Sequence, residues 1–191
     1  TPLDIEFAKK LGFVIKLLAI SKDHNGAVEA RVHPTMVPVH HPLAEVKGVF
    51  NAVFLKGDAV GETMFFGRGA GMMPTASAVV ADIIEVAMGN SIRLFKHLKL
   101  EPRKKTSHII GKVDELTSRF YIKLKVLDKP GVFAQICTIL ADNEISLSGV
   151  LQHEEHNAKN IVPAIVITHQ TGQKKITKAL SDLSKLEIVK E

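Results

Sequence analysis

The chain has 191 residues, a formal net charge of +5 and one cysteine. This length allows one medium domain or two small ones, and a hydrophobic content of 46% is typical of globular rather than disordered proteins. No apolar run approaches the roughly 20 residues that span a bilayer, and the first residues lack a signal-peptide pattern. A lone cysteine excludes an internal disulfide framework. We therefore expect a cytoplasmic protein with no membrane partner.

Basic residues are only mildly in excess, and the one clear basic cluster is Arg103-Lys104-Lys105. Aromatic residues make up 5% of the chain, with no tryptophan and one tyrosine. Proteins that bind nucleic acids usually show a basic stripe with aromatic side chains for stacking. We therefore expect no nucleic-acid partner and interpret the cluster as a solvated linker.

The first half begins with a short predicted helix over residues 2–11, in which Thr1 fits the N-cap, Pro2 the first helical position and Gly12 the end. Two pairs of strands follow, over 13–21 with 28–33 and over 49–55 with 59–66. Pro34 and Pro38 place the continuation of the second strand at an edge or in a loop. Apolar residues at helical spacing after the glycine-rich segment 67–71 predict a long helix over 75–88.

Residues 90–118 are polar and irregular, and the periodic pattern restarts at Arg119. The predicted order is then strand, helix, strand, strand, helix, strand, over 120–127, 132–142, 145–152, 161–168, 173–184 and 186–190. This βαββαβ order is ferredoxin-like, so the fold class is α+β. The predicted organisation is a first domain over 1–105, a linker over 106–118 and a second domain over 119–191.

The second domain carries the run Val126-Leu127-Asp128-Lys129-Pro130-Gly131-Val132-Phe133-Ala134 and, further on, Asn143-Glu144-Ile145-Ser146-Leu147. These segments resemble the ACT domain, a small regulatory module that binds amino acids. Gly131 allows a tight turn, and free N–H groups at the start of the next helix can receive a carboxylate. The resemblance implies an effector site at Asp128, Pro130, Gly131, Asn143 and Ile145. A plain turn, in a module that serves only for pairing, is the alternative.

The first domain carries a second series of motifs, in the order Asp4–Gly12, Arg31–Pro34, His41–Ala44, Gly67–Gly71 and Pro74–Val79. Together they resemble the catalytic domain of homoserine dehydrogenase. That family implies an NAD(P)-dependent oxidoreductase that interconverts L-aspartate 4-semialdehyde and L-homoserine in threonine, methionine and isoleucine biosynthesis. The expected architecture is therefore a partial catalytic-domain sheet with helices, followed by the ACT domain. Threonine is the effector that the family resemblance suggests.

The glycine-rich loop is the candidate cofactor contact. A lone pattern of glycines before a helix is weak evidence for a dinucleotide site, and the third glycine of the Rossmann fingerprint is missing here. The resemblance implies that the loop lies near the nicotinamide end of the cofactor, with Gly69, Gly71 and Thr75 as contacts. Small residues that let the helix pack on the sheet are the alternative.

The family's cofactor-binding domain and its catalytic helix, which supplies Glu, Asp and Lys, should precede this segment. We therefore assign no catalytic residue, expect no tightly bound cofactor and expect the chain alone to be inactive. His33 and His41 are interpreted as structural, and the acidic, histidine-containing stretch 153–156 as a solvated loop rather than a metal site.

Two further expectations concern assembly and the alternative function. Sheet surfaces left open by missing parts, together with the pairing habit of ACT modules, predict a homo-oligomer of at least two chains. The alternative function is non-enzymatic, an ACT-type amino-acid-binding or subunit-pairing module.

Overall fold

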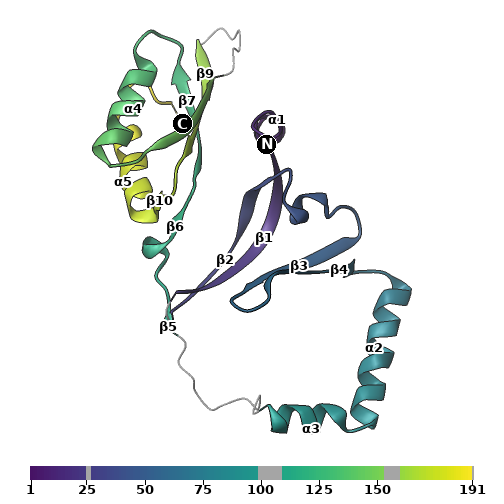
Figure 1. Cartoon of the computed structure of the whole chain (residues 1–191). Helices are drawn as coiled ribbons and strands as arrows, with labels where there is room; N and C mark the ends of the chain where they lie inside the picture. The colour runs from purple at the N-terminus through teal and green to yellow at the C-terminus, as the bar shows by residue number, and fades with distance from the viewer. Residues whose placement is uncertain (25–26, 99–108, 153–159, 191) are drawn as a thin grey trace. The chain divides into compact units, whose positions relative to one another are not determined.

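The computed structural model describes residues 1–24, 27–98, 109–152 and 160–190 (Figure 1). Its internal contacts divide the chain into two compact units. The first unit comprises Thr1–Ile20 and Arg31–Ser107, and the second comprises Ser21–Ala30 and His108–Glu191. Each unit is described by itself below.

The first unit begins with helix α1, Pro2–Lys10. The Thr1 hydroxyl accepts a hydrogen bond from the Asp4 N–H, and the Asp4 carboxylate accepts one from the Thr1 amino group, so the predicted N-cap is a full capping box. Gly12, at a φ of 79°, follows the helix end. Phe7 and Ala8 are each only 1% exposed and form the buried side of the helix.

Strands β1, Phe13–His24, and β2, Ala27–Pro38, follow and belong to a sheet of order β1-β2-β5. Both are longer than predicted. β2 pairs with β5, Ile109–Ile110, in parallel and only through Ala27 and Val28. Pro34 and Pro38 lie beyond those two residues, where a missing N–H breaks no bond to β5.

A single-turn helix η1, Pro42–Glu45, leads to the antiparallel hairpin of β3, Phe50–Gly57, and β4, Gly61–Arg68. Helices α2, Met72–Ala87, and α3, Asn90–His97, follow with a bend of 75° between them. Within the described residues no single helix is long and apolar enough to cross a membrane, and only this bent pair passes that test together. α2 begins three residues before the predicted start, directly after Gly71.

The second unit contains a three-stranded antiparallel sheet of order β7-β9-β8, with β7 at Tyr121–Leu127, β8 at Leu147–Gln152 and β9 at Ile161–Thr168. Helices α4, Val132–Asp142, and α5, Gln173–Leu183, lie together on one side of it (Figure 1). The unit also contains the segment Ser21–Ala30, β5 and three short elements, namely η2, Val113–Glu115, β6, Thr117–Ser118, and β10, Thr171–Gly172.

The predicted last strand, over 186–190, is reduced to one bridge between Val126 and Val189. Two backbone bonds flank that bridge, from Leu127 N to Ile188 O and from Lys190 N to Lys125 O. This segment therefore occupies the edge next to β7, which gives the strand order expected of a βαββαβ unit. The predicted α+β fold class is confirmed.

One apolar core holds the second unit together. Its fully or almost fully buried members come from the sheet and both helices: Ile122, Leu124, Val126, Val132, Ile136, Leu140, Ile145, Val162, Ala164, Val166, Ile176, Ala179 and Leu183. The first unit contrasts with it, because α2 and α3 contain no buried residue at all.

Candidate effector and cofactor sites

The predicted effector loop connects β7 to α4 and is held by the ends of two strands. Asp128 N donates to Asn160 O at 2.9 Å, and Asn160 Nδ2 donates back to Asp128 O at 2.8 Å. Gln152 Nε2, at the end of β8, donates to the Asp128 carboxylate at 3.2 Å. Neither Gln152 nor Asn160 was singled out from the sequence, because no local motif connects them to a loop more than twenty residues away.

Gly131 is the N-cap of α4 and has a φ of 87°, in the left-handed region that L-residues avoid. A Cβ at this position would meet no atom within 4 Å, so backbone conformation rather than space explains the glycine. No side chain caps the helix. The N–H groups of the first turn therefore point toward a region that a carboxylate would suit.

The other two predicted effector residues lie at the opposite end of α4. Asn143 is 8% exposed, and its Nδ2 donates to Ile139 O at 2.9 Å, so it caps its own helix. Ile145 is 4% exposed and belongs to the core. Eleven residues at 1.5 Å each separate the helix ends by about 16 Å. Within one module, Asp128, Pro130 and Gly131 therefore lie together at one end of α4, whereas Asn143 and Ile145 lie at the other end.

Two exposed ion pairs lie near that second end of α4. Lys175 Nζ is 2.5 Å from Glu144 Oε2, and this hydrogen bond, followed by the lysine charge, lowers the pKa of Glu144 below its ordinary value. Lys185 Nζ is 2.9 Å from Asp182 Oδ1 and lowers the pKa of Asp182 in the same way. Glu144 has a φ of 55°, so the turn after α4 uses a left-handed residue that is not glycine.

The glycine-rich loop connects β4 to α2. Gly69 N donates to Val49 O at 3.3 Å, so its N–H already has a partner. A Cβ on Gly69 would lie 1.7 Å from Asn51 Nδ2, which means that the Asn51 side chain occupies the space of a side chain at 69. Packing against β3 therefore accounts for this glycine without a ligand.

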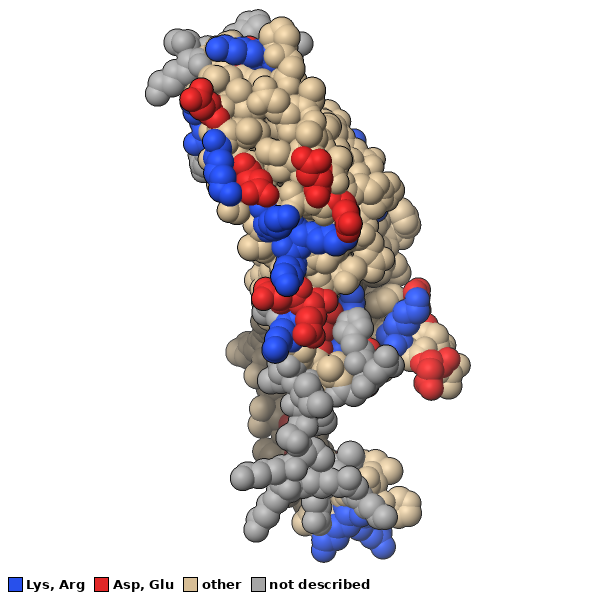
Figure 2. Space-filling view, turned by 90° about the vertical axis from the view of Figure 1, so that its left-hand side faces the viewer, with Lys and Arg blue, Asp and Glu red and all other residues tan. Residues whose placement is uncertain are grey.

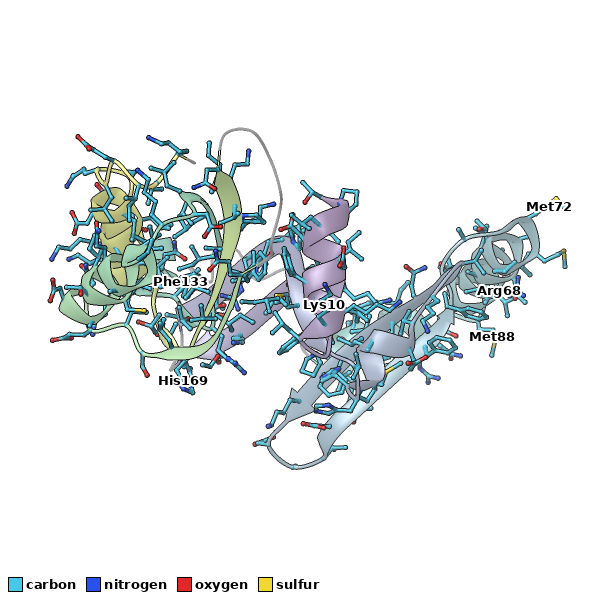
Figure 3. All side chains as sticks on the ribbon, turned by 90° about the horizontal axis from the view of Figure 1, so that it is seen from above. Lys10, Arg68, Met72, Met88, Phe133 and His169 are labelled. Atoms are coloured by element: carbon cyan, nitrogen blue, oxygen red, sulfur yellow. The ribbon has the colours of Figure 1, made fainter. Side chains whose placement is uncertain are left out.

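Gly71 and Thr75 lie together at the start of α2. Gly71 is the N-cap, at a φ of 132°, and Thr75 N donates to Gly71 O at 3.0 Å. Figure 3 shows the neighbouring side chains of Arg68 and Met72 at this end of the hairpin, and the Arg68 guanidinium lies 5.6 Å from the centre of the Phe50 ring. α2 follows an antiparallel hairpin, which is not the parallel context of a Rossmann fingerprint.

His33 and His41, the two histidines interpreted as structural from the sequence, make local contacts. His41 Nδ1 accepts from Leu43 N at 3.2 Å, and its ring lies 4.8 Å from that of Phe54, so it fixes the start of η1. His33 Nδ1 lies 2.9 Å from Pro34 O. Among the described residues no group of three or more His, Cys, Asp and Glu side chains could hold a metal ion. His153, Glu154, Glu155 and His156 lie outside the described residues.

Charges of both signs are interspersed on the face that Figure 2 shows, where lysines and arginines alternate with acidic side chains. Two exposed ion pairs, Lys175–Glu144 and Lys185–Asp182, likewise join opposite charges.

Comparison with known proteins identifies two family matches in order along the chain. The homoserine dehydrogenase family model matches residues 1–84, and the ACT domain model matches residues 120–187. The chain is 42% identical to a homoserine dehydrogenase of Helicobacter pylori over 193 residues, covering 98% of this chain and 43% of that protein. For a homoserine dehydrogenase of Pseudomonas aeruginosa the identity is 37%, with 98% and 44% covered.

Comparison with solved structures also finds homoserine dehydrogenases. The crystal structure of a homoserine dehydrogenase from Thiobacillus denitrificans matches 100% of this chain and 43% of its own, with a TM-score of 0.79 and 35% identity. The chain thus spans less than half the length of the relatives that it matches. On the two family matches and this shared fold, the chain belongs to the homoserine dehydrogenase family, of which it carries the part that contains the glycine-rich loop and the ACT domain.

Proposed function

We propose that this chain is the portion of an NAD(P)-dependent homoserine dehydrogenase that supplies one wall of the active-site cleft and the regulatory module. The whole enzyme would interconvert L-aspartate 4-semialdehyde and L-homoserine by hydride transfer. The observation that carries the proposal is the order of the two family matches, residues 1–84 and then 120–187, on a fold shared over the full chain with a homoserine dehydrogenase.

The chain alone is expected to have no dehydrogenase activity. We assign no catalytic residue in it, and the one glycine-rich loop before a helix follows an antiparallel hairpin rather than a parallel strand. The test is NAD(P)H oxidation with aspartate 4-semialdehyde, with the Helicobacter pylori enzyme as positive control. Turnover by this chain at a rate near that of the control would overturn the expectation.

Gly71 and Thr75 remain the proposed contacts to the nicotinamide end of the cofactor, and Gly69 is kept with them although packing on Asn51 already explains it. NAD(P) would supply the hydride, and this chain would supply only backbone and one hydroxyl at the start of α2. In the whole enzyme Thr75→Val should raise the KM for cofactor, whereas Thr63→Val in β4 should not.

The ACT unit is proposed to bind an amino acid, threonine by family resemblance, at a site completed by a second copy. This follows because α4 separates Asp128, Pro130 and Gly131 from Asn143 and Ile145 by about 16 Å within one module. Two modules that meet with the loop of one against the strand of the other would assemble the set, and we therefore expect a dimer or larger oligomer.

Isothermal calorimetry with threonine and light scattering test this together. Heat at millimolar threonine and a mass of at least two chains are the expected results. A dimer with no heat would favour the second candidate, a pairing module without a ligand. The buried positions of Asn143 and Ile145 favour that candidate, since both side chains have structural roles already.

A further inference from the structure

Asn51 lies on β3 beside the glycine-rich loop. It pairs in register with Gly67, and Gly69 follows Gly67 on the same face of the opposite strand, because side chains alternate between the two faces. Gly69 N donates to Val49 O at 3.3 Å, so the pairing of the two strands continues past the end of β4. Asn51 therefore faces two positions of the opposite strand that both lack a side chain.

The two glycines are not equivalent. A Cβ on Gly69 would lie 1.7 Å from Asn51 Nδ2 and 2.6 Å from Asn51 Cγ, whereas a Cβ on Gly67 would meet no atom within 4 Å. Neither glycine has a φ in the left-handed region, so backbone conformation does not require glycine at either position. Gly69 is therefore needed for space, and the group that fills this space is the Asn51 amide.

The Asn51 amide is a polar group on a face of β3 that is otherwise apolar. Val53 and Leu55 share that face, and both are exposed. Within the residues that the structure describes, the Asn51 side chain makes no hydrogen bond. An amide has one carbonyl acceptor and two N–H donors, so these groups are available to a ligand. A role in packing alone would be filled equally well by an apolar side chain.

The neighbours of this amide indicate which ligand it can bind. Gly71, the N-cap of α2, follows Gly69 closely, and Thr75 lies near the start of the helix. β4 thus leads from the contact with Asn51 directly into the proposed cofactor contacts (Figure 1). An uncharged group that both donates and accepts suits the carboxamide and the ribose hydroxyls at the nicotinamide end of NAD(P), whereas a phosphate is better matched by a cation.

We infer that Asn51 is a cofactor-binding residue, and that Gly69 acts through it by leaving room for its amide. The Asn51 side chain hydrogen-bonds to a neutral polar group at the nicotinamide end of the cofactor. Gly69 is then a positioning residue rather than a contact. This inference rests on the proposed function, which supplies the cofactor. NAD(P) provides the hydride when it is bound, and Asn51 helps to orient it.

The contact between Asn51 and Gly69 is tested by NMR on this chain, without cofactor. In proton–nitrogen correlation spectra the side-chain amide signals of Asn51, identified by their loss in Asn51→Ala, should shift in Gly69→Ala because the new methyl group displaces the amide. In Gly67→Ala they should shift much less, since that methyl group enters open space. Equal shifts in the two variants, or no shift in either, would overturn the inference.

The cofactor contact is tested in the whole enzyme by equilibrium fluorescence with NADH and with NADPH, with no substrate present. Asn51→Ala should weaken binding about three- to tenfold, as expected for the loss of one hydrogen bond. Gly69→Ala should weaken it by a similar factor. The double variant should lose no more than about twofold beyond either single variant, because both changes remove the same amide from its place. Val53→Ala, on the same face of β3, should change the affinity less than about twofold.

Two results of the binding measurement would contradict the role of Asn51. One is an unchanged affinity in Asn51→Ala, and the other is a double variant whose loss equals the product of the two single losses. A whole enzyme that binds neither NADH nor NADPH before any substitution would instead refute the proposed function. The spectra of this chain would then still show whether Gly69 makes room for the Asn51 amide.

Discussion

Replacement of Ile136 by alanine should destabilise the ACT unit severely. Ile136 is 0% exposed at the centre of the core between α4 and the sheet. The change removes three buried carbon atoms, worth about 2.4 kcal/mol at about 0.8 kcal/mol each. The cavity left behind raises the loss to about 3–4 kcal/mol. A domain of roughly 80 residues has about 4–12 kcal/mol of stability, so the loss is a large part of the whole.

Urea unfolding followed by tyrosine fluorescence measures this loss directly. The chain has one tyrosine and no tryptophan, and Tyr121 lies in β7 of the same unit. With a slope of about 1–1.5 kcal/mol per molar urea, the midpoint should fall by about 2 M or more. Leu180→Ala removes the same number of carbon atoms from a side chain that is 40% exposed, and should cost about 1 kcal/mol. Equal midpoint shifts for the two variants would refute the account of the core.

Three more outcomes are expected. Gly131→Ala should cost about 1–2 kcal/mol because its φ is 87°, while Gly149→Ala, with an ordinary φ and open space around it, should stay within about 0.5 kcal/mol in the same urea assay. Lys175→Met should raise the pKa of Glu144 toward its ordinary value in an NMR titration. Since a lowered pKa gives stability that is present above the ordinary value of about 4.3 and is lost as pH falls through the lowered one, this variant should also lose less stability in acid. Thr168→Val should cost about 1–3 kcal/mol, because the fully buried Thr168 hydroxyl accepts a hydrogen bond from the part-buried Phe120 N–H at 2.9 Å, and Thr168→Ser should restore most of it.

Local chemistry made much of the fold predictable. The Thr1 cap and the Pro130-Gly131 turn are set by neighbours within a few residues, and the helices that they predict are present. The predicted last strand is reduced to one bridge because the N–H groups of Leu186 and Val189 donate within turns, to Leu183 O and Leu186 O, and so do not bond to β7. Periodicity measures which side chains face inward, not how many backbone bonds form.

The sites were less predictable because they depend on contacts distant in sequence. Gly69 is required because the side chain of Asn51, on β3, occupies the space that a side chain at 69 would need. No sequence pattern around residue 69 indicates this contact. Gln152 and Asn160 hold the Asp128 loop from two strand ends. Asn143 and Ile145 matched a family motif, yet burial gives each of them a role in the helix end and the core. A sequence motif therefore identifies the type of domain, but it does not establish the role of each residue within the motif.

The division of the chain into units has a consequence for its synthesis. The segment Ser21–Ala30 belongs with residues after 107, and Ala27 pairs with Ile109. During synthesis, residues 21–30 of the second unit therefore emerge from the ribosome long before β5, with which β2 pairs. Vectorial folding cannot complete the sheet β1-β2-β5 until residue 110 has emerged, so the segment Ser21–Ala30 must wait for the rest of its unit. Ribosome-associated chaperones would be expected to engage the nascent chain during that interval.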